Sequence, residues 1–522
     1  MAEVSRTARV IQNAKVALFF YCINLILQFF SRKIFLDYLG AELLGLNTTA
    51  QNLLQFLNLA ESGIGAAVAF ALYKPLSQGS RQEIIDIVSL QGWFYRWVGL
   101  FVIVGSIVLM AFFPWIFAKA QISLIYAYVT FTIFLISTLL GYFVNYKMIV
   151  LSADQKEYKV TTVTQGVKVA KIFVQMIAVL NLDNAYIWWM FIEFLAAIVT
   201  SIFLTYYIKK EYPWLRSASF SGKYLKNKYP YILTKTKQLF FHKIGGYVLG
   251  QTTPLVVYAF TTLTTVAIYG NYVLVMGGCL MLVEALFKGV TASVGNLVVS
   301  GNSKQIREIF WKIVTIKLIF AGAICCGIAV LSNSFITLWI GSNYVMPIES
   351  MLVMVAIYFI QMTRTSEIFL SAYGLFQDIF APLLESILNL VLSILFGYYW
   401  GLTGILVGIL LSQIIVVNSW KVYFLYSKGF RTSIIEYVIG YTKKLLLLCL
   451  AFLSVYCVFE CIFNVEAHDF YEWCLLGLFV IAFYFCVSAI LFYLFDSVFK
   501  LLIKQLINVI KLKLAQYGSF SD

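Results

Sequence analysis

Charged residues and histidine are scarce in this chain of 522 residues. Asp, Glu, Lys and Arg make up only 12% of it and hydrophobic residues 61%, which excludes a water-soluble domain. The two histidines, His242 and His468, have no histidine or cysteine partner at ligand spacing, and the nine cysteines lie almost entirely in apolar runs without zinc or redox spacing. We therefore expect no metal site and no cofactor.

Sequence motifs for catalysis are also missing. There is no GxxxxGK(S/T) phosphate loop, which excludes ATP hydrolysis by that route. No pair of carboxylates lies on a connection of useful size, as a membrane glycosyltransferase or polymerase needs. The formal charge of +14 is not concentrated in a basic block of a soluble fold, so the positive-inside rule explains it better than nucleic-acid binding does. We predict that the protein is not an enzyme and does not bind nucleic acid.

Long apolar runs fill most of the chain. The length needed to cross the hydrocarbon of a bilayer, roughly twenty residues, divides the sequence into about fourteen spans. The basic amino terminus precedes a run long enough to span, so we expect the first helix to be its own insertion signal. The predicted spans centre near Leu25, Gln55, Val102, Ile133, Ala170, Leu195, Leu249, Leu280, Gly322, Ala356, Leu388, Ile409, Phe452 and Phe483.

Lys and Arg are distributed unevenly among the connections. Eight of them lie between residues 209 and 237, and the segments 6–15, 147–159, 304–312, 428–444 and 500–513 are basic too. The segments 181–184, 332–347 and 464–470 contain no Lys or Arg. By the positive-inside rule both termini are cytoplasmic, which requires an even number of spans, and the outer connections are short.

An internal repeat is indicated by an offset of 222 residues, which lays residues 78–84 on residues 300–306 and the second span on the eighth. Together with the basic segment it predicts two pseudo-symmetric six-helix lobes and a terminal helix pair. The expected parts are a first lobe at 1–208, a basic cytoplasmic linker at 209–234, a second lobe at 235–427, the helix pair at 428–498 and a basic cytoplasmic tail at 499–522.

A polar stripe marks the second span. Asn47, Gln51, Gln55, Asn58 and Ser62 recur every three or four residues and share one helix face. An unpartnered amide in hydrocarbon costs several kcal/mol, so this face points at other helices or into a water-filled cavity. Amides that only join helices and amides that line a cavity both fit the pattern, and similar stripes on the first and fifth spans favour the cavity.

Two glycines interrupt the end of this span. Gly63 and Gly65 are candidate hinge residues where the span meets a short amphipathic helix expected at residues 81–87. Glu61 lies beside them. It is either a coupling site for H⁺ or Na⁺ or a carboxylate that braces the glycine break.

The fifth span has a doubly cationic face formed by Gln165, Lys168, Lys171 and Gln175. Ionisable residues within spans usually face a bundle interior or an aqueous path. No acidic residue lies within a turn of the two lysines, so a ligand anion or a carboxylate on another helix must neutralise them.

The first span repeats this spacing with Asn24, Gln28 and Arg32. Arg32 either faces a cavity or extends to the outer membrane interface. In the second half of the chain, Lys243 lies in the seventh span, and Arg364 and Glu367 could pair at i, i+3. Further polar positions within spans are Glu193, Glu284, Lys288, Lys317, Glu385 and Asn389. Cations exceed unpaired carboxylates, and a cavity lined this way would attract anions.

The segments LGAELLGL (residues 39–46) and NLAESGIGAAVAFALYKPL (residues 58–76), followed by the helix expected at 81–87, resemble one transporter family. They are similar to the Wzx-type O-antigen or capsule repeat-unit flippases of the multidrug/oligosaccharidyl-lipid/polysaccharide (MOP) exporter superfamily. The resemblance implies an all-α polytopic membrane protein with V-shaped lobes of the MATE and MurJ type, in a bacterial cytoplasmic membrane. The motifs cover only about forty residues, although the expected layout of helices extends along nearly the whole chain.

The implied substrate is an undecaprenyl-diphosphate-linked oligosaccharide, moved to the outer leaflet by alternating access, with H⁺ or Na⁺ coupling. The implied protein is a monomer that works beside polymerase and chain-length partners. Its last two spans would offer an apolar groove for the lipid tail. In the seventh span Thr253 and Pro254 stand where an acidic residue is expected, which puts a coupling role there in doubt.

The resemblance and the residue pattern together suggest three groups of site residues. The cations Arg32, Lys168, Lys171, Lys243 and Arg364 would attract the diphosphate or acidic sugars. The amides Asn24, Gln28, Asn47, Gln51, Gln55, Asn58, Gln165 and Gln175 would line the cavity. Two alternatives remain: a drug/cation antiporter of the same fold, which calls for an acidic cavity, and an O-antigen polymerase or ligase, which calls for a large outer loop.

Overall fold

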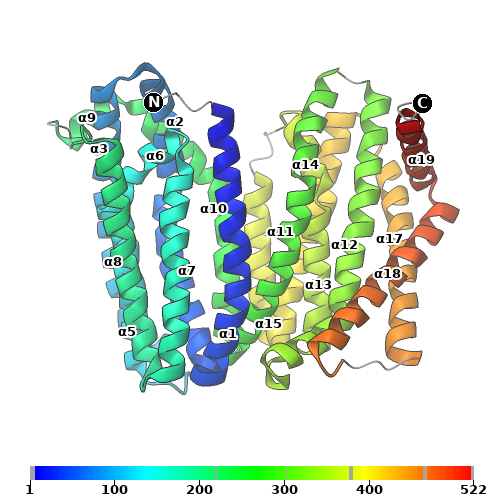
Figure 1. The fold of residues 1–522 in the computed structure, drawn as a ribbon, viewed down its shortest axis with the longest axis horizontal. Helices are drawn as coiled ribbons and strands as arrows, with labels where there is room; N and C mark the ends of the chain where they lie inside the picture. The colour runs from blue at the N-terminus through cyan, green and yellow to red at the C-terminus, as the bar shows by residue number, and fades with distance from the viewer. Residues whose placement is uncertain are drawn as a thin grey trace. The chain divides into compact units, whose positions relative to one another are not determined.

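The computed structural model describes residues 6–216, 218, 220–300, 302–375, 380–462 and 467–518, and in these ranges the chain is almost entirely helical, without a β-strand (Figure 1). Side chains are described except at 6–11, 241–249, 288–289, 291–293, 296, 299–300, 460–462 and 509–518. The helices gather into two compact units, Met1–Gly270 and Asn271–Asp522. The division after Gly270 is later than the expected linker, and the predicted lobe boundaries stay predictions.

The amino-terminal unit consists of α1 (Arg6–Asn58), η1 (Leu59–Glu61), α2 (Ile64–Gln78), α3 (Arg81–Ala111), α4 (Phe113–Ile116), α5 (Leu124–Phe143), η2 (Asn145–Met148), α6 (Ile149–Ala153), α7 (Glu157–Asn181), α8 (Ala185–Glu211), α9 (Gly222–Lys228) and α10 (Pro230–Phe260). The next helix, α11 (Leu263–Ser300), begins in this unit and continues into the second.

The carboxy-terminal unit continues with α12 (Ser303–Ile340), η3 (Ser342–Tyr344), α13 (Ile348–Thr363), α14 (Thr365–Ala372), α15 (Phe380–Gln413), the π-helical η4 (Ile414–Trp420), α16 (Lys421–Phe424), the π-helical η5 (Leu425–Phe430), α17 (Ile435–Tyr456), the π-helical η6 (Cys457–Ile462), α18 (Phe470–Phe495) and α19 (Ser497–Gly518).

The number of membrane crossings agrees with the prediction. Eleven helical segments are long and apolar enough to span a bilayer. Two of them, residues 12–61 and 380–430, contain a glycine with a non-helical backbone, Gly40 (φ 82°) and Gly401 (φ 55°), so each holds two crossings. The 31 residues of α10 have the length of one more. Every predicted span centre lies within one of these crossings, and the protein is an all-α polytopic membrane protein.

The helix boundaries repeat with the offset found in the sequence. α3 begins at Arg81 and α12 begins at Ser303, 222 residues later. The residue before each of these helices, Ser80 or Asn302, is a small polar residue of the kind that caps a helix. Gly40, where α1 breaks, corresponds by the same offset to Thr262, which separates α10 from α11. These boundaries support the inferred duplication.

One predicted element is wrong. Residues 81–87 do not form a separate short helix, because they are the first turns of α3, which continues to Ala111. No proline occurs between residues 81 and 111, and a helix continues when nothing interrupts its backbone hydrogen bonds. The amphipathic segment and the third span are therefore a single helix.

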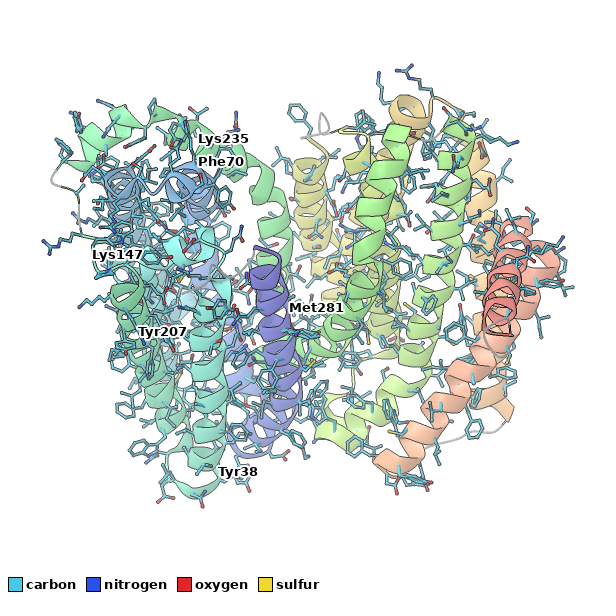
Figure 2. All side chains as sticks on the ribbon, turned by 45° about the horizontal axis from the view of Figure 1, so that its top comes forward. Tyr38, Phe70, Lys147, Tyr207, Lys235 and Met281 are labelled. Atoms are coloured by element: carbon cyan, nitrogen blue, oxygen red, sulfur yellow. The ribbon has the colours of Figure 1, made fainter. Side chains whose placement is uncertain are left out.

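The break at the end of the second span lies at Gly63. Its φ of 98° is left-handed, and an added Cβ would lie 2.8 Å from the Thr236 carbonyl oxygen of α10. Gly65 lies inside α2 with an ordinary helical backbone. α10 also contacts α2 farther along, where the Lys235 ammonium lies 5.8 Å from the centre of the Phe70 ring (Figure 2).

Candidate functional site

The polar face of the fifth span lies on α7, which packs between α1 and α8 in the amino-terminal unit. Lys171 contacts a carboxylate that is distant in sequence: its Nζ lies 2.7 Å from Glu193 Oε1 and 2.8 Å from Glu193 Oε2 on α8. Both side chains are about four-fifths buried, with 17% and 20% exposed. Of the two expected ways to neutralise these lysines, the structure shows the carboxylate on another helix for Lys171.

Gln175 completes this contact. Its Nε2 donates to Glu193 Oε2 at 3.2 Å and to the Trp189 carbonyl oxygen at 3.0 Å, and the residue is 1% exposed. Glu193 is therefore held by an ammonium and an amide from two successive turns of α7. Gln175 thus orients this carboxylate, and the cavity role expected of it stays a prediction.

Lys168 is the remaining cation of the face. It is partly buried one turn before Lys171, and in the part of the chain that the structure describes it has no ion pair and no hydrogen bond. Its electrostatic neighbours are Lys171 and Glu193. Two ammonium groups thus share a single carboxylate, which leaves one positive charge uncompensated.

The first span adds amides and a guanidinium to the unit. Asn24 donates through Nδ2 to Gln165 Oε1 at 3.1 Å, which joins α1 to α7, and Gln28 is half-buried one turn later. Arg32 donates through Nη2 to the Ala267 carbonyl oxygen of α11 at 3.2 Å. Gly270 permits this approach, since a Cβ there would lie 2.8 Å from Arg32 Nη2.

The stripe on the second span contains amides of two kinds. Asn47 accepts a hydrogen bond from the Tyr186 hydroxyl at 2.8 Å, and Asn58 accepts one from Tyr142 at 3.0 Å, so both join helices. Gln51 and Gln55 are exposed. An exposed amide within a span avoids lipid, because hydrocarbon offers it no hydrogen-bond partner. The exposure of Gln51 and Gln55 therefore fits side chains that face an aqueous cavity.

Glu61 accepts a hydrogen bond from the Tyr95 hydroxyl at 2.6 Å. The bond links the 3₁₀ turn η1 to α3, next to the break at Gly63. This geometry fits a brace, one of the two roles expected of Glu61.

Arg364 belongs to an ionic cluster in the carboxy-terminal unit. It lies at the break between α13 and α14, 3.5 Å from Glu367 Oε1 and 3.4 Å from Glu385 Oε1, which confirms the predicted pairing with Glu367. Lys421 Nζ contacts Glu367 Oε1 at 2.5 Å. Arg364 contacts two carboxylates, so it is not a free positive charge, and the buried Lys317 is a further cation near Glu367. The side chain of Lys243 lies outside the described residues.

The sequence interpretation missed several partners. Lys421 and Glu385 complete the cluster around Arg364, although 36 residues separate them. Lys444 was assigned to a cytoplasmic connection, but it is buried in α17 and paired with Asp496 at the end of α18. No local spacing reveals these pairs, because each joins helices whose contact is tertiary.

The predicted basic linker is held to α3 by one buried acid. Asp86 is fully buried and accepts hydrogen bonds from Lys228 at 2.7 Å and from the Tyr229 hydroxyl at 3.2 Å. The hydrogen bond to Asp86 raises the pKa of Lys228 above its ordinary value. The short helix α9 is therefore anchored by a charge-assisted contact.

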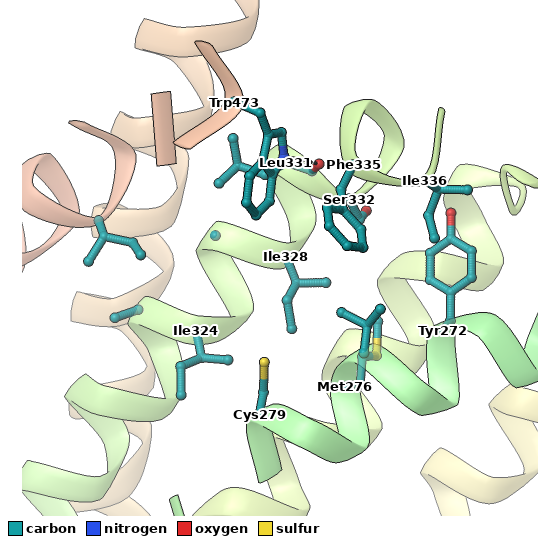
Figure 3. A pocket seen from close by; sticks show the side chains of 14 residues that line it. Tyr272, Met276, Cys279, Ile324, Ile328, Leu331, Ser332, Phe335, Ile336 and Trp473 are labelled. Carbon is teal, nitrogen blue, oxygen red and sulfur yellow. Dashed lines mark hydrogen bonds between the residues drawn. The ribbon is translucent and has the colours of Figure 1, made fainter. Parts of the chain in front are cut away.

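An apolar pocket of about 230 Å³ lies in the carboxy-terminal unit between α11, α12 and α18. Figure 3 shows Cys279, Met276 and Ile324 on its walls, and Trp473 and Phe335 at one end. Trp473 is fixed by donating through Nε1 to the Leu331 carbonyl oxygen at 3.1 Å. Among the described residues no three His, Cys, Asp or Glu side chains gather at a possible metal site.

Comparison of the sequence with protein-family profiles and with characterised proteins finds no match. Among solved structures, the fold is similar to the lipid II flippase MurJ in an inward closed conformation, with a TM-score of 0.63 and 16% identity over 92% of this chain and 99% of that one. It is also similar to an inward-facing multidrug resistance MATE family transporter of the MOP superfamily, with a TM-score of 0.57 and 13% identity over 80% of this chain and 98% of that one. At these identities the likeness shows the fold, and the expected MATE and MurJ type is confirmed.

Proposed function

We propose that this chain is a MOP-superfamily transporter that flips an undecaprenyl-diphosphate-linked oligosaccharide, a polysaccharide repeat unit, to the outer leaflet of a bacterial cytoplasmic membrane. The observation that carries the proposal is the positive charge left over at Lys168. A partly buried ammonium without a counter-charge is costly, and a bound anion removes that cost. A diphosphate supplies both the charge and the acceptor oxygens that ammonium groups bind.

The sugars and the isoprenoid chain of such a substrate also find suitable side chains, the sugars in the amino-terminal unit and the isoprenoid chain in the carboxy-terminal unit. The exposed amides Gln51 and Gln55, with Gln28, offer hydrogen bonds to sugar hydroxyls. The apolar pocket beside Trp473 and Met276 suits part of an isoprenoid chain. We include Arg32, Lys171, Lys243 and Arg364 among the candidate cations, and Lys168 takes first place because its charge is uncompensated.

The alternatives fit less well. A drug/cation antiporter calls for an excess of carboxylates, whereas the α7 face has an excess of cations. A polymerase or ligase calls for a large outer loop, and the predicted outer connections are short. We further propose that both termini are cytoplasmic, that Gly63 and Gly65 form part of a gate, that H⁺ or Na⁺ drives transport, and that the chain acts as a monomer beside polymerase and chain-length proteins.

The test is a deletion strain complemented with single variants and scored for lipid-linked repeat units in the inner leaflet. Lys168→Gln should accumulate these units and lose most surface polysaccharide while the protein reaches normal membrane levels. The matched control is Lys33→Gln, which removes an exposed lysine of α1 that pairs with Asp37 at 3.3 Å. Normal surface polysaccharide with Lys168→Gln would remove this residue from the site, and no accumulation in the deletion strain would reject the flippase.

A further inference from the structure

We propose that Glu193 couples proton uptake to anion binding at the α7 site, which consists of Lys168, Lys171 and Gln175. When the site is empty, the Glu193 carboxylate pairs with Lys171. When a phosphate-type anion takes the place of the carboxylate at Lys171, Glu193 takes up one proton. The inference rests on the proposed function and adds a coupling residue that sequence reasoning did not single out for this role. It assigns the proton to a carboxylate on α8 rather than to Glu61.

The contact between Lys171 and Glu193 excludes an anion as it stands. Both carboxylate oxygens lie within 2.8 Å of Lys171 Nζ, so the carboxylate covers the ammonium and competes for its hydrogen bonds. A diphosphate that uses Lys168 and Lys171 together must therefore displace Glu193. A ligand that uses only Lys168 would leave half of the cationic face unused.

Displacement changes the charge that surrounds Glu193. With Lys171 taken over by phosphate oxygens, an ionised Glu193 would stand beside a bound anion in a partly buried setting. Like charges at such distances cannot both stay ionised without a large cost, so the carboxylate binds a proton from solution. When the anion leaves, the proton leaves too and Lys171 pairs with Glu193 again, so protons and charges balance over the cycle.

Among the described residues that pack against α8, we find no second carboxylate facing Lys171. α7 faces Glu193 with Lys168, Lys171 and Gln175, and Gln175 Nε2 keeps donating to Oε2 whether or not Oε1 carries the proton. α5 packs against α8 and contains no Asp, Glu, His, Lys or Arg, and its tyrosines ionise only at alkaline pH. η2 contributes Lys147, whose ammonium lies 5.9 Å from the Tyr146 ring centre. Glu193 is thus the acid whose protonation depends on whether Lys171 is free to pair with it.

The experiment measures proton uptake with the purified full-length chain. Farnesyl diphosphate is titrated calorimetrically at alkaline pH, where the ligand is fully ionised, in buffers of different ionisation enthalpy. Wild-type protein should take up about one proton per ligand, and its Kd should rise about tenfold per pH unit. Glu193→Gln keeps the size and a hydrogen bond to Lys171, and it should bind without proton uptake and without the pH slope.

Two controls keep the outcomes distinct. Asp183→Asn removes an exposed acid from the connection between α7 and α8 and should behave as wild type. Equal proton uptake by wild type and Glu193→Gln, or loss of uptake in Glu61→Gln instead, would overturn the assignment while leaving the diphosphate site in place. Absence of any farnesyl diphosphate binding by wild type would reject the proposed function, and this inference with it.

Discussion

A lysine in a membrane-spanning helix needs a counter-charge or access to water, and the two lysines of α7 differ in this respect. Lys171 has Glu193, and Lys168 has no ion pair among the described residues. The difference separates structural from functional effects of substitution. Removing Lys171 breaks the ion pair of a mostly buried carboxylate, whereas removing Lys168 breaks no ion pair among the described residues.

Lys171→Gln should therefore lower the free energy of unfolding by about 1–3 kcal/mol, less than for a fully buried pair because both side chains keep some contact with solvent. The double variant Lys171→Gln with Glu193→Gln should recover most of this loss, because both members of the ion pair are then neutral and Lys168 is without an ion pair in wild type as well. Thermal unfolding in detergent measures both. Lys168→Gln is the matched single change and should unfold like wild type. Equal destabilisation by the two lysine variants would contradict this distinction.

Residue pairs close in sequence could be predicted, and pairs distant in sequence could not. The spacing of Arg364 and Glu367 by three residues indicated their contact, because side chains one turn apart on a helix meet. Glu193 and Glu385 were recognised as polar positions within spans, yet their partners depend on which helices pack together. Periodicity along one helix carries no information about the facing helix, so Lys444 could not be matched with Asp496.

At the scale of the helices, apolar length predicted the crossings well because the bilayer thickness fixes it. Helix ends were less certain. The polar first turns of α3 were predicted to be a separate helix, although no residue between 81 and 111 interrupts the helix. The glycine break was placed correctly within three residues, and only the backbone geometry distinguishes Gly63 from Gly65.

The two glycines should respond oppositely to alanine. Gly63→Ala should destabilise the protein by about 1–3 kcal/mol, because a left-handed φ is unfavourable for residues with a Cβ. It would also force a Cβ to within 2.8 Å of Thr236 on α10. Gly65→Ala should be neutral or stabilise by up to about 1 kcal/mol, because Gly65 has a helical backbone in the first turn of α2, where alanine is favoured over glycine, and the nearest atom, Tyr95 Oη, is 3.6 Å away.

Thermal unfolding of the two alanine variants, expressed and purified side by side, tests this contrast. A similar loss of stability at both positions would mean that the backbone break requires both glycines, which contradicts this prediction. Transport by Gly65→Ala at the wild-type rate would further restrict a gating role to Gly63.

At the scale of the whole molecule, composition alone identified a polytopic membrane protein, and the fold confirms it. The charge of the connections predicts how the chain is oriented in the membrane. The predicted lobe boundaries stay predictions: the basic linker between residues 209 and 234 suggests a boundary, and α10 beyond it packs on α1 and α2.

Orientation is testable with fusions to a reporter enzyme that is active only outside the cytoplasm. Fusions at Asp183 and Asn343 should be active, and fusions at Phe220 and Asn302 should be inactive, because the positive-inside rule keeps the basic connections in the cytoplasm. A fluorescent reporter that folds only in the cytoplasm should give the reverse pattern at the same four sites. Matching activity at Asp183 and Phe220 would contradict the predicted topology.

The equal offsets of α3 and α12, and of the breaks at Gly40 and Thr262, also bear on ancestry. A constant spacing at two boundaries is the pattern that tandem duplication of a shorter gene leaves behind. Because the repeated part is expected to hold an even number of crossings, the positive-inside rule predicts the same polarity for both copies. The last helix pair and α19 lie beyond the two copies. Residues of this part, including Lys444 and Asp496, therefore lie outside the repeated pattern.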